Sequence, residues 1–174
     1  MKTLLATLLL LAALALADEV PTEKGVTLLL KIITYDSHFD SASTAPFVVL
    51  VPFDADRAKA EAAVDELGVL AKTTIKGRPL AFKVVSADQL ESDASAILAL
   101  PGIGAPLLAE IARVGQKQHR YTLGLSETAA KKYTALGVLT GASGKPEILV
   151  NVPIVKAIGA EFPPAILKVA KLIQ

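Results

Sequence analysis

Strand-like and helix-like stretches alternate along most of the chain. Residues 47–51 form an apolar run, rich in β-branched side chains and bounded by prolines, which is typical of a strand buried on both faces. Residues 57–71 are rich in alanine and charged side chains, as expected of a crossover helix. The same alternation predicts strands at 80–85, 96–100 and 121–125, a short helix after Ser86, and helices at 105–116 and 128–136. Strands that alternate with helices predict βαβ units and a mostly parallel sheet with helices on both faces.

The two ends of the pattern differ from its middle. Residues 26–33 are apolar enough for a strand or a helix, and the polar residues after Tyr35 favour a helix that ends there. Toward the other end we expect a hairpin of 138–140 with 148–150, a helix capped by Asn151, and a last helix over 165–173. Together these elements predict a single three-layer α/β domain over residues 18–174.

Two of the expected helices begin with capping residues. Asp54 is expected to cap the helix over 57–71, with Asp56 beside it as a partner of the helix dipole. Ser86 and Gln89 have the spacing of a capping box and predict a short helix there.

The first residues have the pattern of a secretory signal peptide. Lys2 is followed by an unbroken apolar run over 4–16, and Ala15-Leu16-Ala17 is a small-x-small cleavage site. We expect residues 1–17 to be removed after Ala17 and the remaining chain to be exported to the periplasm. The alternative is an uncleaved membrane anchor, for which this run is short, because a spanning helix needs about 20 residues.

Composition excludes several classes of function. The chain has 174 residues, 18 Lys and Arg against 17 Asp and Glu, and a formal net charge of +1. It therefore lacks the basic excess that would neutralise phosphates, and no nucleic-acid partner is expected. Without cysteine there is no disulfide, thiolate nucleophile or cysteine-ligated metal, and two isolated histidines do not suggest a metal site. No cofactor is expected.

Two motifs resemble catalytic signatures without completing them. Ser126 lies between an expected strand and an expected helix, like a nucleophile elbow, but Thr128 replaces the second glycine. Both histidines also precede Ser126, so the order of a hydrolase triad is missing, and a helix N-cap explains this serine equally well. The glycine-containing segment 141–146 lacks the first glycine and the Ser/Thr of a phosphate-binding loop and is interpreted as a turn. We expect no catalytic residues, and a hydrolase is the least favoured alternative.

A glycine-containing segment after the third expected strand is the best candidate for binding. Residues 101–105 precede a helix, whose backbone N–H groups and dipole favour an anion or carboxylate, although a tight turn explains the segment as well. Ligands of open α/β sheets bind at the carboxyl ends of the strands. The candidate ligand-binding residues at these ends are Phe53, Asp54, Gly102, Gly104, Ser126 and Glu127.

The order of segments resembles the YfiR-like family of small periplasmic proteins, a DUF4154-type domain. The similar segments are Leu28 to Tyr35, Lys76-Gly77-Arg78-Pro79-Leu80, Ile148-Leu149-Val150-Asn151, Ala157 to Phe162 and Ala165 to Ala170. The resemblance implies a regulator without enzymatic activity, since the family's namesake represses a membrane-bound diguanylate cyclase by contacting its periplasmic segment. Some relatives carry cysteines, and this chain has none, so redox control through a disulfide is excluded.

Two functions follow as hypotheses. The first is an exported protein that binds an inner-membrane sensor, such as a diguanylate cyclase of the cyclic-di-GMP pathway or a sensor kinase, and shifts its equilibrium between states. The alternative is a periplasmic protein that binds a small anion or carboxylate in the strand-end crevice, in connection with an uptake system. The oligomeric state is left open, a homodimer included.

Overall fold

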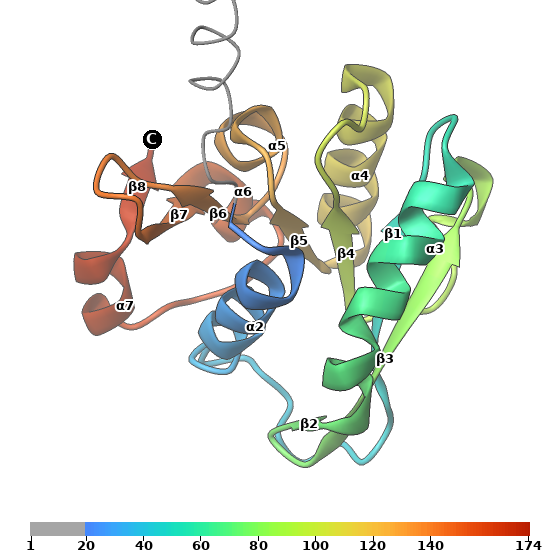
Figure 1. Cartoon of the computed structure of the whole chain (residues 1–174). Helices are drawn as coiled ribbons and strands as arrows, with labels where there is room; N and C mark the ends of the chain where they lie inside the picture. Colours follow the sequence, from blue (N-terminus) through green and yellow to red (C-terminus); the bar gives the residue numbers. More distant parts are fainter. Residues whose placement is uncertain (1–19) are drawn as a thin grey trace, which may run out of the picture.

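The computed structural model describes residues 20–174, as a mixed α/β fold (Figure 1). The predicted signal peptide and its cleavage after Ala17 lie outside the described residues. Within residues 20–174, no helix combines the length and the apolar character needed to cross a membrane.

The helices follow the predicted order closely. They are α2 (Thr22–Ile33), α3 (Arg57–Glu66), η2 (Leu67–Lys72), η3 (Ala87–Gln89), α4 (Ala105–Gln118), α5 (Glu127–Lys132), α6 (Val152–Ala157) and α7 (Pro164–Val169), where η denotes a 3-10 helix. The capping box of Ser86 with Gln89 is present, and the side chain of Asn151 accepts a hydrogen bond at the start of α6. These two predictions are confirmed.

The described residues form one eight-stranded sheet in the order β2-β3-β1-β4-β5-β6-β7-β8. Its strands are β1 (Phe47–Pro52), β2 (Thr74–Ile75), β3 (Arg78–Val85), β4 (Ala96–Ala99), β5 (Tyr121–Gly124), β6 (Leu136–Thr140), β7 (Pro146–Asn151) and β8 (Lys171–Ile173). Neighbouring strands are parallel except in two pairs, β2 with β3 and β6 with β7. The prediction of a mostly parallel sheet with a hairpin near its end is confirmed.

Helices cover both faces of this sheet (Figure 1). Successive side chains of β1 point to opposite faces, so that Val49 and Val51 join the apolar cluster that contains the buried side of α2 and Ala60 of α3. Leu50 belongs to the other cluster, which contains the buried side of α4 and Ala129 of α5. This alternation explains why the central strands are apolar throughout, because each packs against helices on both sides.

Three local predictions were wrong. The helix expected over 128–136 ends at Lys132, and Leu136 is already the first residue of β6. The cap of α3 is Asp56, whose side chain accepts a hydrogen bond from the Lys59 N–H at 3.0 Å, while Asp54 lies outside the helix. The last segment is not one helix over 165–173, because α7 ends at Val169 and β8 follows it as a strand parallel to β7. Pairing with β7 satisfies the backbone of these last residues, and tertiary contact of this kind overrides helical periodicity in a short segment.

Candidate functional site

The order of the parallel strands creates a switch point beside β1. From β1 the chain passes through α3 and η2 to β3 on one side, and from β3 it returns to β4 on the other side of β1. At such a point the connections leave the sheet in opposite directions, and a crevice opens outside the carboxyl ends of the two strands. In this fold those ends are Phe53-Asp54 after β1 and the segment 100–104 after β4.

The crevice at this point, here called the switch crevice, has a volume of about 180 Å³. It is lined by Pro52, Phe53, Asp54, Ala55, Asp56, Lys59, Ala60, Leu100, Pro101, Gly102 and Ile103. A second hollow of about 490 Å³ shares Phe53 and Asp54 with it and extends toward Ser86 and Glu110. Three of the six predicted binding residues thus line one crevice, and Gly104 stands next to it.

Lys59 places a cation at this crevice. Its Nζ donates a hydrogen bond to the Pro101 carbonyl at 2.8 Å, which ties α3 to the turn after β4. An ammonium group has three N–H donors, and no other hydrogen bond of Nζ occurs within residues 20–174. Lys59 was not among the predicted residues. It stands in the first turn of α3, so its side chain lies near the turn after β4 only because β4 is the neighbour of β1.

Asp54 and Gly104 contact each other across the crevice. The Gly104 N–H donates to Asp54 Oδ2 at 3.2 Å, so a carboxylate of the chain itself lies at the start of α4. A Cβ at position 104 would lie 2.9 Å from that oxygen, so any other residue there would require the Asp54 side chain to move. Gly102 has a φ of +91°, a conformation that glycine adopts without strain. The two glycines therefore shape the rim of the crevice, and one N–H that was expected to meet a ligand already has an internal partner.

Ser126 and Glu127 lie in a different pocket. That pocket has a volume of about 400 Å³ and is also lined by Lys131 and Lys171, with no residue in common with the switch crevice. Ser126 caps α5 by accepting a hydrogen bond from the Ala129 N–H at 3.3 Å, which confirms the N-cap interpretation. Glu127 pairs with Lys131, and this hydrogen bond lowers the pKa of the Glu127 carboxyl. The six predicted residues thus fall into two groups, because Ser126 and Glu127 follow β5, on the far side of β4 from β1, and their pocket extends toward the hairpin of β6 and β7.

Comparisons with known proteins support the fold and leave the family open. No protein-family model matches the chain, and no curated protein matches it. The resemblance to the YfiR-like family therefore stays a prediction.

Solved structures of similar fold include three from bacteria. A conserved domain protein of Vibrio cholerae has 14% identity and a TM-score of 0.63, over 88% of this chain and 60% of that one. The ligand-free, open form of CD0873, a substrate-binding protein with adhesive properties from Clostridium difficile, has 13% identity and a TM-score of 0.63, over 89% and 60%. An ABC domain from Streptococcus pneumonia in complex with L-Trp has 12% identity and a TM-score of 0.60, over 88% and 62%.

This chain thus spans about three fifths of the length of each of these structures. At sequence identities of 12–14%, this similarity shows that the folds are alike.

Proposed function

We propose that this protein is an exported, non-enzymatic binding protein that holds a small carboxylate ligand in the switch crevice. One observation carries the proposal: the Lys59 ammonium and the Asp54 carboxylate both line one partly apolar crevice. The crevice lies at the switch point of a parallel sheet, where ligands of open α/β folds bind. Export is inferred from the pattern of residues 1–17.

The lining suggests what the ligand looks like. The free N–H groups of Lys59 suit a carboxylate, and the ring of Phe53 and the side chain of Ile103 suit an apolar portion. Asp54 uses one oxygen for Gly104, and its other oxygen can accept a hydrogen bond from an ammonium group. An amino acid carries all three features. Among proteins of similar fold, one is described as a substrate-binding protein and another as a complex with L-Trp, which supports amino acids as the first class to test.

The test is a titration of the purified protein with single amino acids and with simple carboxylates, followed by calorimetry and thermal unfolding. We expect saturable binding by at least one of them and an upward shift of Tm that grows with ligand concentration. Replacing Lys59→Met is expected to weaken binding by about tenfold, because the cation that meets the carboxylate is removed.

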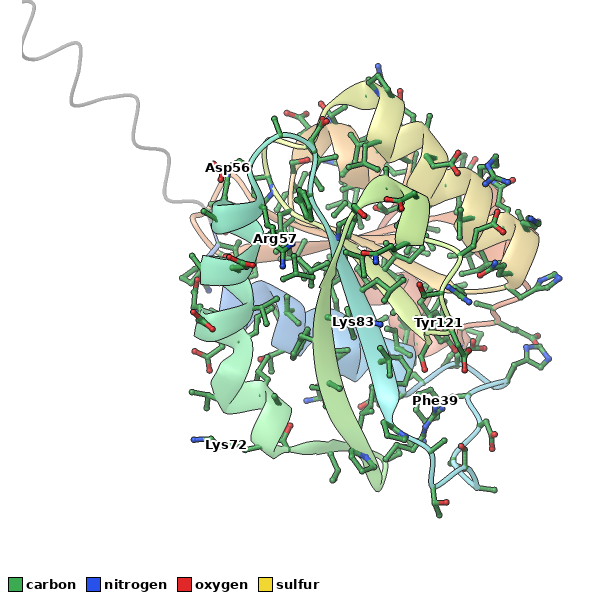
Figure 2. All side chains as sticks on the ribbon, turned by 90° about the vertical axis from the view of Figure 1, so that its right-hand side faces the viewer. Phe39, Asp56, Arg57, Lys72, Lys83 and Tyr121 are labelled. Atoms are coloured by element: carbon green, nitrogen blue, oxygen red, sulfur yellow. The ribbon has the colours of Figure 1, made fainter. Side chains whose placement is uncertain are left out.

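Lys72→Met is the matched control for this variant. Lys72 is an exposed lysine at the far end of the same helical segment, distant from Asp56 in Figure 2. It is expected to bind like the unmodified protein. The proposal is wrong if no amino acid or carboxylate binds at millimolar concentration, or if both lysine variants lose binding equally.

The signalling role implied by the resemblance is a second candidate, favoured by a separate observation. Val169 is 72% exposed and Leu172 is 38% exposed, and they lie at the end of α7 and on the edge strand β8. Exposed apolar side chains at a sheet edge favour protein contacts. In-cell crosslinking followed by mass spectrometry would identify an inner-membrane sensor, and Val169→Lys is expected to reduce its recovery. Recovery of the same membrane protein by Val169→Lys and by the unmodified chain would exclude this surface.

A further inference from the structure

A second pocket lies at the opposite end of the sheet, where the strands begin. It has a volume of about 380 Å³ and lies between the amino ends of β1, β3 and β5, the loop after α2 and the end of α4. Phe39 and Tyr121 mark this end in Figure 2, away from Asp56 and Arg57. We call it the amino-end pocket; the residues that matter here are Asp36, Arg78, Gln118, Arg120 and Tyr121.

The acidic side chains of this pocket are already engaged within the fold. Buried Asp36 accepts hydrogen bonds from the Tyr121 hydroxyl at 2.6 Å, from the Glu161 N–H at 2.8 Å and from the His38 N–H at 3.0 Å. Asp40 accepts from two N–H groups of its own loop at 3.1 Å. These carboxylates hold the walls of the pocket together. Because their oxygens already accept hydrogen bonds from the chain, they repel a bound anion less strongly.

The guanidinium groups are arranged differently. Arg78 donates through Nε to the Ala45 carbonyl at 2.9 Å and through Nη2 to the Pro46 carbonyl at 3.3 Å, and it lies over the ring of Phe47 at 5.3 Å. Buried Arg120 donates through Nη1 to two carbonyls, those of Leu90 and Ser92. Within residues 20–174, neither arginine has a carboxylate within salt-bridge distance. Their guanidinium groups are thus held by backbone carbonyls without a direct ion pair, and a bound anion would complete the charge pairing.

Gln118 has a polar side-chain atom without a hydrogen-bond partner. Its side-chain oxygen Oε1 is buried and has no hydrogen-bond partner in the described part of the chain, and Gln118 lines the pocket. A buried acceptor without a donor destabilises the fold unless water or a ligand donates to it.

We propose that the amino-end pocket binds a small organic anion: a carboxylate that also carries a hydroxyl group. Arg78 meets the carboxylate through Nη1, which has no hydrogen bond among the described residues, because Nε donates to Ala45 and Nη2 donates to Pro46 and Ser95. The Gln118 side chain turns its Oε1 toward the pocket and accepts a hydrogen bond from the hydroxyl. The rings of Phe39 and Phe47 with Ile158 pack against the carbon skeleton. This site is separate from the switch crevice and does not depend on the function proposed for it.

The test uses L-malate, L-tartrate and L-lactate as probes, with succinate as the matched acid without a hydroxyl group. Binding is followed by calorimetry and by amide chemical shifts of the isotope-labelled protein at constant ionic strength. We expect saturable binding of at least one hydroxy acid, stronger than that of succinate, with shifts at Ser95, Tyr121 and Gly159. Arg78→Gln is expected to weaken binding by about tenfold.

Lys83→Gln is the control with the same loss of charge on the same strand. Lys83 is exposed on β3 and lines neither pocket (Figure 2). It is expected to bind like the unmodified protein. If Arg78→Gln does not fold, Gln118→Leu provides the test. The Gln118→Leu protein is expected to bind both L-malate and succinate, without a preference for L-malate.

The proposal is overturned if no hydroxy acid binds, if chloride competes as well as the organic acids do, or if Gln118→Leu keeps the preference. It is also overturned if the shifts map to Lys59 and Gly102. Amide shifts at Ser95 and Tyr121 report binding in the amino-end pocket, and shifts at Lys59 and Gly102 report binding in the switch crevice, so failure at one site is distinguishable from failure at the other.

Discussion

The two ends of the sheet use their charged side chains in opposite ways. Among residues 20–174, exposed Asp54 of the switch crevice makes one hydrogen bond, and Lys59, which extends over the turn after β4, also makes one. In the amino-end pocket, Asp36 is buried with three hydrogen bonds, and the arginines are fixed by backbone carbonyls. Changes at the amino end should therefore cost stability, whereas changes at the switch crevice should alter binding with little loss of stability.

The largest expected effect is that of Asp36→Ala. It leaves the Tyr121 hydroxyl and the backbone N–H groups of His38 and Glu161 without their acceptor, and we expect the free energy of unfolding to fall by about 2–4 kcal/mol. Asp36→Asn keeps one acceptor oxygen for the two N–H groups, so less than half of that loss is expected. Urea denaturation measures both, and similar losses for the two variants would contradict this account.

A smaller effect is expected for Gly104→Ala in the switch crevice. The new Cβ would lie 2.9 Å from Asp54 Oδ2, but this oxygen ends a rotatable side chain and can move away. The expected loss is therefore that of one exposed hydrogen bond, about 1 kcal/mol, with altered ligand affinity. A loss as large as that of Asp36→Ala would show that the two ends of the sheet do not differ.

The smallest expected effect is a change in alkaline stability through Tyr121. Burial away from water, followed by the hydrogen bond to Asp36, raises the pKa of its hydroxyl in the folded protein. The unfolded chain then releases this proton first, near pH 10, so the stabilising contribution is full below that pH and declines above it. Tyr121→Phe should flatten this decline in denaturation curves taken at rising pH. Tyr35→Phe, at an exposed tyrosine, is the control and should not change it.

Periodicity in the sequence predicted most of the fold, and it failed where pairing decides the structure. The central strands β1 and β4 are apolar on both faces, and this pattern needs no knowledge of their neighbours. By contrast, Lys171–Ile173 is a strand only because β7 offers an edge to pair with. Asp54 and Asp56 are equally good caps by residue type, and only the turn after Phe53 places Asp56 at the start of α3.

The site was predictable only in part, for a related reason. Phe53, Asp54 and Gly102 follow directly from the rule that ligands bind at strand ends, and they do line one crevice. Lys59 depends on which strand lies next to β1, and the amino-end pocket gathers residues from many separate segments. The spacing of these residues along the chain does not indicate that they form one pocket, because only the order of strands in the sheet brings them together.

The central place of β1 also has a consequence for the order of folding. Its two edges are completed by β3 and β4, with Phe47 opposite Leu80 and Val49 opposite Ala96, so each pairing closes a long loop. Loop closure of this kind slows folding, whereas the hairpin of β6 and β7 joins Thr140 to nearby Pro146. We therefore expect the hairpin to form early and β1 to be enclosed late. Both pockets border β1, so they would be completed in the last steps of folding, when most of the chain already has its structure.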